Sequence, residues 1–440
     1  MVSVSLAPAQ TASPAATSRA KQPAKKKPVA KKTVGKIPAT KKRAVNPAVP
    51  VSPAVRRAAF ETISARVARP QSTIEGAGAL VPFFEQVSRP SADGPVRILQ
   101  YGDSHTASDD WADEMRQLFQ RKFGAGGAGF TFPGHPFLGY RRFDSRGTNS
   151  KGWHTDGLVT RTGDGVYGLG GISLTAQTAR ETVTLSAECQ QLELHYLEQP
   201  GGGRLEFAVD GNAVDTISTD GESAAGIYQY KPTPGPHQFS LRTLDAAPVR
   251  LFGWVAQNES GVTYETLGIN GAQAALQLRW SEPVVTREMA DREPALIVVA
   301  YGTNEAVSKT WTAEEYRTDL GQVIQRLRAA APLAGILLVG PPDAQYRLKG
   351  GGRLPLPHLQ QVIDIERQVA LENGCAFWDW RARMGGPGSV RQWVQAGLGQ
   401  ADYVHMTSAG YRLIGDTLFA EIMAQYDRFL AARAERADGQ

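Results

Sequence analysis

The sequence contains few of the residues from which metal centres and disulfide frameworks are built. Its 440 residues include two cysteines and seven histidines. Cys189 and Cys375 fit no C-x-x-C pattern, which excludes a cysteine-based metal or redox motif and allows at most one internal disulfide. Because free cysteines prefer the protein interior, we expect two buried thiols. No run of about 18 apolar residues occurs, so we expect no membrane-spanning helix.

Acidic residues are absent from the first 60 positions, which hold 13 of the 48 lysines and arginines. The rest of the chain has 35 basic and 43 acidic residues, so the net charge of +5 comes from this segment. No nucleic-acid-binding motif accompanies the charge, and we predict no nucleic-acid partner. Residues 1–55 are rich in Ala, Pro and Lys without an apolar period, which predicts a disordered tail. Its basic runs indicate a solvated linker or, less favoured, a segment that touches anionic envelope polymers.

Strand and helix patterns alternate on both sides of a β-rich middle segment. The pattern predicts helices over about 54–67, 76–87, 313–329, 359–372 and 408–433, and a helix containing Trp111, Met115 and Phe119. It predicts buried strands over 96–101, 295–300, 335–339 and 375–378. Thr407 or Ser408 is the expected cap of the last helix. Such alternation is typical of an α/β fold in which a parallel sheet has helices on both faces, an α/β/α sandwich.

The middle segment has the texture of an antiparallel β-domain. Alternating apolar runs cover 182–185, 192–197, 205–209, 238–243 and 250–255, with Gly, Pro and Asp turns between them. Short strands at this spacing predict an inserted β-sandwich or jelly roll. We therefore divide the chain into a tail (1–55), a first α/β part (56–130), an inserted β-sandwich (131–262) and a second α/β part (263–435).

Four short motifs in a fixed order contain the residues needed for acyl transfer from an ester. They are Gly102-Asp103-Ser104-His105, Gly268-Ile269-Asn270-Gly271, Gly302-Thr303-Asn304-Glu305 and Asp402-Tyr403-Val404-His405. Ser104 follows a predicted buried strand and precedes a helix, which is the local setting that exposes a nucleophile at the carboxyl edge of a sheet. Asp103 is expected to hold this turn.

His405 is the candidate base for Ser104, because a serine hydroxyl needs a group that takes its proton. Asp402 lies three residues earlier, where its carboxylate can reach Nδ1 of the same ring while Nε2 faces Ser104. His105 is adjacent to Ser104 and is expected to be structural or to face the substrate. The other histidines have no metal-ligand spacing, and we predict no catalytic metal and no cofactor; they are His135, His154, His195, His237 and His358.

Three groups are candidates for the oxyanion hole that a tetrahedral intermediate requires. They are the backbone N–H groups of Ser104 and Gly271 and the side-chain amide of Asn304. Glycine at 271 allows close approach of the backbone. Asn304 follows the predicted strand 295–300, which should end at the same sheet edge as Ser104.

The four ordered motifs resemble the blocks of the SGNH (GDSL-like) hydrolases, with His105 in place of the Leu of the commoner GDSL form. The arrangement is most similar to peptidoglycan O-acetylesterases of Gram-negative bacteria, which share the Gly-Asp-Ser-His and Gly-Ile-Asn-Gly-Ala forms. The resemblance implies an α/β hydrolase domain with an inserted module similar to a carbohydrate-binding β-sandwich. It also implies removal of acetyl groups from the C6 hydroxyl of muramoyl residues and a periplasmic setting. The first ten residues, however, show no secretory signal pattern.

Three hypotheses remain at this stage. The leading one is a serine esterase that removes O-acetyl groups from peptidoglycan or another acetylated glycan, with the β-insert holding the polymer. A second is an O-acetyltransferase that passes the acetyl group to a glycan hydroxyl. A third is a glycan-binding protein with an inactive hydrolase domain. The aromatic residues of the insert are candidate sugar platforms but are more typical of a core; they are Tyr196, Tyr228, Tyr230 and Trp254.

Overall fold

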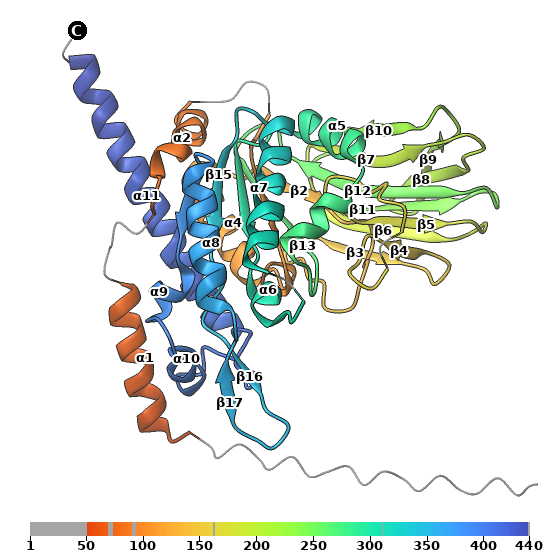
Figure 1. Cartoon of the computed structure of the whole chain (residues 1–440). Helices are drawn as coiled ribbons and strands as arrows, with labels where there is room; N and C mark the ends of the chain where they lie inside the picture. The colour runs from red at the N-terminus through yellow and green to blue at the C-terminus, as the bar shows by residue number, and fades with distance from the viewer. Residues whose placement is uncertain (1–50, 69–73, 90–93, 162, 311, 439–440) are drawn as a thin grey trace, which may run out of the picture. The chain divides into compact units, whose positions relative to one another are not determined.

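A five-stranded parallel sheet lies at the centre of the α/β part of the protein (Figure 1). The computed structural model describes residues 51–68, 74–89, 94–161, 163–310 and 312–438. The strands lie in the order β13 (Val262–Gly268), β1 (Val96–Gly102), β14 (Leu296–Ala300), β15 (Gly335–Val339) and β18 (Ala376–Trp378). All four pairings are parallel, so the predicted parallel sheet is confirmed. The predicted tail falls almost entirely outside the described residues.

Each face of this sheet is covered by its own helices. One face packs against α5 (Glu282–Arg292), α7 (Ala313–Ala330) and α8 (Leu359–Glu372) through side chains such as Leu99 and Ile297. The other face packs against α2 (Val81–Val87), α4 (Asp110–Phe123) and α11 (Ser408–Asp438) through side chains such as Ile98 and Val298. Successive strand residues point to opposite faces, which explains why the central strand β14 is apolar and buried along its whole length.

Several helix starts follow from local sequence. Thr312 and Glu315 form a reciprocal capping box at the start of α7. The Thr407 hydroxyl accepts a hydrogen bond from the Gly410 N–H, so Thr407 is the cap of α11, one of the two predicted residues. The remaining helices are α1 (Pro53–Val67), α3 (Ser104–Ala107), α6 (Thr303–Val307), α9 (Trp380–Met384), α10 (Val390–Gln395) and the 3₁₀ helices η1 (Ala77–Leu80) and η2 (Ala274–Arg279).

The β-rich middle segment forms two antiparallel sheets (Figure 1). One contains β10 (Ala224–Tyr230), β7 (Gln191–Glu198), β12 (Val249–Gln257), β5 (Ser173–Ala176) and β4 (His154–Asp156), with β2 (Gly127–Thr131) also paired to β12. The other contains β3 (Arg146–Asn149), β6 (Thr182–Glu188), β11 (Pro236–Thr243), β8 (Arg204–Val209) and β9 (Asn212–Ser218). Side chains from both sheets share one buried cluster. The predicted domain boundaries stay predictions, and β2 crosses the one between residues 130 and 131.

Two elements near the motifs are not predicted by the apolar pattern. Strand β13 leads into the second motif, but Thr263, Glu265 and Thr266 are buried polar residues that interrupt its apolar run. The antiparallel pair β16 (Gln345–Arg347) and β17 (Arg353–Pro355) is too short to show a period. Strand β13 ends at Gly268 of the second motif, and β17 contacts the loop that contains Asp402.

Candidate active site

Ser104 lies at the carboxyl end of strand β1, where the sequence predicts it. A Cβ atom at Gly102 would overlap the Thr106 hydroxyl and lie 2.6 Å from the Ala300 carbonyl oxygen, so the turn requires glycine. Asp103 caps the short helix α3 by accepting a hydrogen bond from the His105 N–H at 2.9 Å. The turn leaves the Ser104 side chain half-buried at the edge of the sheet.

His405 joins Ser104 to Asp402. The His405 Nε2 atom lies 2.8 Å from the Ser104 hydroxyl oxygen, and its Nδ1 atom lies 2.8 Å from Asp402 Oδ2. The other carboxylate oxygen of Asp402 accepts hydrogen bonds from the N–H groups of Val404 and His405. The predicted nucleophile, base and orienting carboxylate are therefore brought together from positions about 300 residues apart in the chain.

The contact between Asp402 and His405 shifts the pKa of each toward its charged form. Partial burial raises the pKa of Asp402, but the hydrogen bonds from His405 and from two backbone N–H groups outweigh burial and bring this pKa to about 2. The hydrogen bond to Asp402 raises the pKa of His405 above its ordinary value, against the effect of burial. The carboxylate is ionised at neutral pH and stabilises the imidazolium that forms when the ring accepts a proton.

The register of three neighbouring strands brings the first three motifs to one place. Gly102 of β1 pairs with Gly268 of β13 on one side and with Ala300 of β14 on the other. The loops that follow these residues therefore start at the same level of the sheet edge. Gly271 lies in one of these loops. Its φ is 77°, and the space that a Cβ atom would occupy is open.

Asn304 is the second residue of α6 and lies beside the turn that holds Ser104. Its Nδ2 atom donates to the Ala272 carbonyl oxygen at 2.9 Å and to Asp103 Oδ2 at 3.3 Å. One N–H of the amide is thus held by the Gly271–Ala272 loop. The other makes a longer and weaker contact with the carboxylate next to Ser104. Through its bond to Ala272, the Asn304 amide connects the two predicted oxyanion donors Gly271 and Asn304.

His105 has a structural position. It is buried, and its Nδ1 atom lies 2.8 Å from the Tyr411 hydroxyl, while its ring contacts the edge of Trp380. Burial holds the pKa of His105 well below its ordinary value, so the ring is neutral at physiological pH. The sequence analysis expected His105 either to be structural or to face the substrate. Its buried contacts agree with a structural role.

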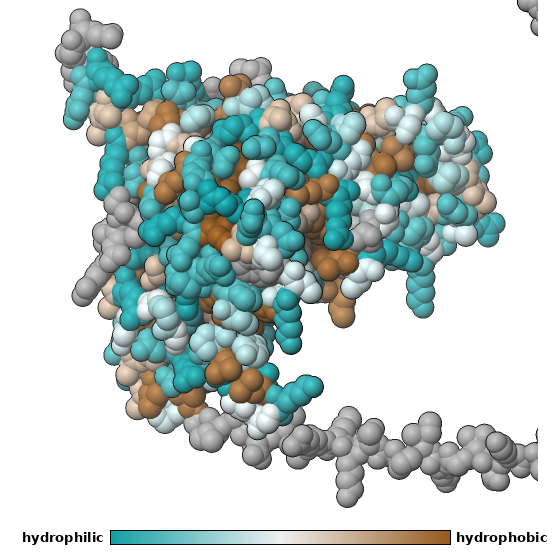
Figure 2. Space-filling view, in the orientation of Figure 1, coloured by the Kyte–Doolittle hydropathy of each residue, from teal (hydrophilic) through white to brown (hydrophobic). Residues whose placement is uncertain are grey.

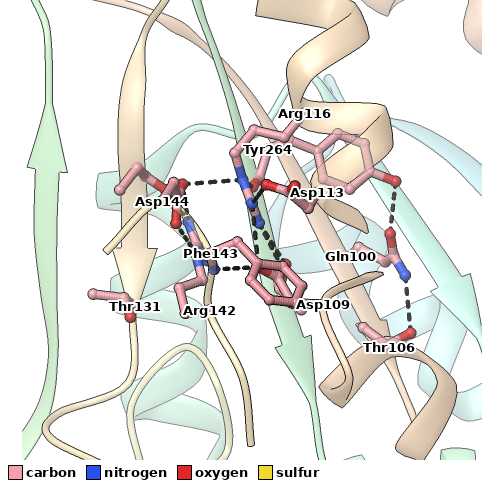
Figure 3. Close-up of polar contacts among 12 residues, drawn as sticks. Gln100, Thr106, Asp109, Asp113, Arg116, Thr131, Arg142, Phe143, Asp144 and Tyr264 are labelled. Carbon is pink, nitrogen blue, oxygen red and sulfur yellow. Dashed lines mark hydrogen bonds and ion pairs between the residues drawn. The ribbon is translucent and has the colours of Figure 1, made fainter. Parts of the chain in front are cut away.

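A buried ionic cluster around Arg116 is not predicted from the sequence (Figure 3). Arg116 of α4 pairs with Asp109 at 2.7 Å, Asp113 at 2.8 Å and Asp144 at 3.0 Å. Asp109 also accepts hydrogen bonds from the Thr266 hydroxyl of β13 and from the Phe143 N–H. The cluster connects the helix after Ser104 with the strand before Gly271. Asp109, Asp113 and Arg116 are close in the sequence, but Asp144 and Thr266 join them only in the folded chain, so the complete cluster is visible only in the structure.

Glu305 is a second residue whose role only the structure shows. Its carboxylate is buried and accepts hydrogen bonds from the Ala274 N–H at 2.7 Å and from the Gly302 N–H at 3.0 Å. Burial raises its pKa to about 7, although both N–H donors act in the opposite direction. Glu305 thereby joins the third motif to the loop after Gly271.

The predictions about metal sites, thiols, sugar platforms and membrane helices concern other residues of the chain. In the described part of the chain, no group of three or more His, Cys, Asp or Glu residues is arranged to hold a metal ion. Cys189 and Cys375 are both free and buried, in agreement with the expected thiols. Trp254 and Tyr196 belong to the core between the antiparallel sheets, and Tyr228 and Tyr230 pack against it. None of the helices over the described ranges is long and apolar enough to cross a membrane.

The chain was compared with known families and structures. Residues 234–413, which include the last three motifs, match the GDSL-like Lipase/Acylhydrolase family. No curated protein sequence matches the chain. A solved structure of a peptidoglycan O-acetylesterase is 26% identical, with a TM-score of 0.68 over 80% of this chain and 96% of that chain. A family two carbohydrate esterase from Clostridium thermocellum is 13% identical, with a TM-score of 0.30 over 57% of this chain and 94% of that chain.

The family match and the first of these structures agree with the motifs and with the parallel sheet. The family match begins at residue 234, within the β-rich segment, and so leaves out the first motif. The structural match spans both parts of the fold. The two matches together support an SGNH (GDSL-like) hydrolase, a carboxylic ester hydrolase that resembles peptidoglycan O-acetylesterases.

Proposed function

We propose that this protein is a serine esterase that removes O-acetyl groups from a polysaccharide, namely from the C6 hydroxyl of muramoyl residues in peptidoglycan. The observation that carries the reaction is the pair of 2.8 Å contacts that connect Ser104, His405 and Asp402. The similarity to a solved peptidoglycan O-acetylesterase over 80% of the chain supports the choice of polymer.

In the proposed reaction, Ser104 is the nucleophile. Its hydroxyl oxygen forms a bond to the acetyl carbonyl carbon while its proton passes to His405 Nε2. The tetrahedral intermediate then loses the sugar oxygen, which takes the proton from His405 and leaves as a free hydroxyl. Water then attacks the carbonyl carbon of the acetyl-serine while His405 Nε2 takes one of its protons; the second tetrahedral intermediate loses the Ser104 oxygen, which takes this proton back, and acetate is released.

The oxyanion of each tetrahedral intermediate is assigned to three donors around Ser104. They are the Ser104 and Gly271 N–H groups and the Asn304 amide. Ser104 is the first residue of α3, a position whose N–H has no acceptor within the helix. The Asn304 N–H that makes the longer contact with Asp103 is the one available to turn toward the substrate. Each such donor typically contributes about 2.7–4 kcal/mol to transition-state stabilisation.

The two antiparallel sheets are proposed as a carbohydrate-binding module that holds the polymer. The aromatic rings considered as sugar platforms lie in or against the core, which favours polar and charged groups as the glycan contacts. We further propose a periplasmic location, in keeping with a peptidoglycan substrate. An interaction of the basic tail with anionic envelope polymers remains a proposal about residues outside the described ranges.

The test is acetate release from O-acetylated peptidoglycan and from acetylated xylan by the wild type and by Ser104→Ala. We expect Ser104-dependent release that favours peptidoglycan. Ser108→Ala is the matched control, because Ser108 lies one turn further and donates to the His105 carbonyl oxygen instead of contacting His405.

Each other outcome contradicts a different part of the proposal. Equal or greater release from xylan would retain the esterase and reject peptidoglycan. Acetate release that persists in Ser104→Ala would remove Ser104 from the mechanism. Transfer of acetyl to an added glycan in place of acetate release would indicate a transferase. Binding of peptidoglycan without any turnover would indicate a glycan-binding protein.

A further inference from the structure

The loop that bears Asp402 and His405 is held by the β16–β17 hairpin. The hairpin extends from the α/β part at the end where α6 lies (Figure 1). The Gln345 N–H of β16 donates to the Tyr403 carbonyl oxygen at 2.9 Å. The surface at this end of the molecule carries both hydrophobic and hydrophilic residues (Figure 2). The hairpin is thus a neighbour of the loop without belonging to any of the four motifs.

Arg353 of β17 makes the most extensive contact with this loop. Its guanidinium donates to the Asp402 carbonyl oxygen at 2.7 Å and to the Ala401 carbonyl oxygen at 2.6 Å. The same group stacks over the ring of Tyr403 at 3.9 Å from the ring centre. A planar guanidinium presents its donors in a fixed fork, so two carbonyls and one ring are held in a single geometry.

The backbone of this loop needs such support. Tyr403 is a non-glycine residue with a φ of 67°, a left-handed conformation that is sterically unfavourable for residues with a side chain. It lies between Asp402 and His405, where the chain must turn so that the Asp402 carboxylate faces back to the His405 ring. Strained conformations of this kind persist when the surrounding structure holds them. Arg353 binds the carbonyls on the N-terminal side of Tyr403 and covers its ring, and the Asp402 carboxylate stays bonded to His405.

We infer that Arg353 is a positioning residue for the reaction: it fixes the Asp402–His405 loop so that the Asp402 carboxylate stays aligned with His405 Nδ1. The inference rests on the proposed function for the roles of Asp402 and His405. Arg353 acts through backbone carbonyls and does not touch the reacting atoms. Its loss misaligns the base while leaving the surface that receives the acetyl group in place.

The experiment compares Arg353→Lys and Arg353→Ala in the full chain, with a small acetyl ester as substrate. We expect kcat to fall about 10- to 100-fold with KM nearly unchanged, because small displacements of catalytic groups have effects of this size. Lysine keeps the positive charge and loses the fork, so both variants should be impaired. Added guanidinium ion at a non-denaturing concentration should restore part of the activity of Arg353→Ala, whereas equal ionic strength of NaCl should not.

Arg347→Ala is the matched control, since Arg347 is exposed and lies directly across the hairpin from Arg353. Thermal unfolding must show that all variants are folded. A second readout is independent of turnover: the low-field proton NMR signal of the His405 Nδ1–H bonded to Asp402 should be lost or shifted in Arg353→Lys. The charged and titratable neighbours that act on this ring are Asp402, Asp103 and His105, all unchanged in that variant.

The outcomes separate this inference from the proposed function. Unchanged kcat and an unchanged low-field signal in Arg353→Lys would overturn the positioning role. A rise in KM alone, or an equal loss in Arg347→Ala, would also overturn it, because the hairpin would then act on substrate binding or on the fold. If the wild type hydrolyses no ester, the proposed function fails, and the NMR signal still tests whether Arg353 aligns the pair.

Discussion

The imidazole rings of His105 and His405 lie 5.1 Å apart between their centres, yet His405 is the one that is hydrogen-bonded to Ser104. The two rings differ in their partners. His105 is bonded to the Tyr411 hydroxyl in a buried site, and His405 is bonded to the Asp402 carboxylate in a half-exposed one. Of the two, only His405 has a carboxylate partner that would stabilise its imidazolium form, which supports our proposal that His405 is the base.

Asp402→Asn should lower kcat strongly. An amide at this position donates to the ring where the carboxylate accepts, which favours the wrong tautomer of His405. The same change in a Ser-His-Asp protease lowers kcat by about 10⁴-fold. The measurement is steady-state turnover of a small acetyl ester, with Asp427→Asn as an exposed control in α11. An unchanged rate would mean that another group orients His405.

The pH dependence of kcat/KM should show an acidic limb with a midpoint above the ordinary histidine value of about 6.5. His405 acts as a base when neutral, and its bond to Asp402 raises its pKa, so activity must rise with pH through this raised value. Asp402 has a pKa of about 2 and stays ionised throughout. In Asp402→Asn the midpoint should move to lower pH. His237→Asn, in strand β11 of an antiparallel sheet, should leave the midpoint in place; a midpoint that follows His237 would contradict the proposed role of His405.

Asn304→Ala should reduce kcat about 10²–10³-fold with little change in KM, because the amide acts on the oxyanion of the transition state. The loss of its bond to the Ala272 carbonyl also frees the Gly271–Ala272 loop. Kinetics with a small acetyl ester measure the effect, and Asn212→Ala at the exposed start of strand β9 is the control. Full activity in Asn304→Ala would exclude the side chain as an oxyanion donor.

Asp109→Asn should destabilise the fold. Asparagine tolerates the φ of 61° at this position, so the main change is the loss of one negative charge beside Arg116. Breaking a buried ion pair typically costs about 3–5 kcal/mol, and because Asp113 and Asp144 still face Arg116 we expect the lower end. Urea unfolding measures the free energy, with Asp427→Asn as the exposed control. A difference below about 0.5 kcal/mol would show that the cluster contributes little to stability.

Much of the α/β fold follows from the sequence. The strands over 295–300 and 335–339 are continuous apolar runs, as expected for strands that are buried on both faces, and the strand over 96–101 is mostly apolar; each is present. Strand β13 differs because its buried Glu265 and Thr266 are satisfied by Arg292 of α5 and by Asp109. Partners of this kind come from other elements, so the local pattern of β13 does not identify it as a strand.

By itself the sequence determined the candidate nucleophile, base and oxyanion donors, because each follows a strand or precedes a helix in a recognisable local turn and the four motifs keep one order. The tertiary structure alone decided which side chains meet. The strand register aligns Gly102, Gly268 and Ala300, and the approach of α11 brings His405 to Ser104. The Arg116 cluster, Glu305 and Arg353 belong to the same class of contacts. Each has a partner that is distant along the chain: Asp144 for Arg116, Ala274 for Glu305 and Asp402 for Arg353. Pairing between distant residues is a property of packing that no local period encodes.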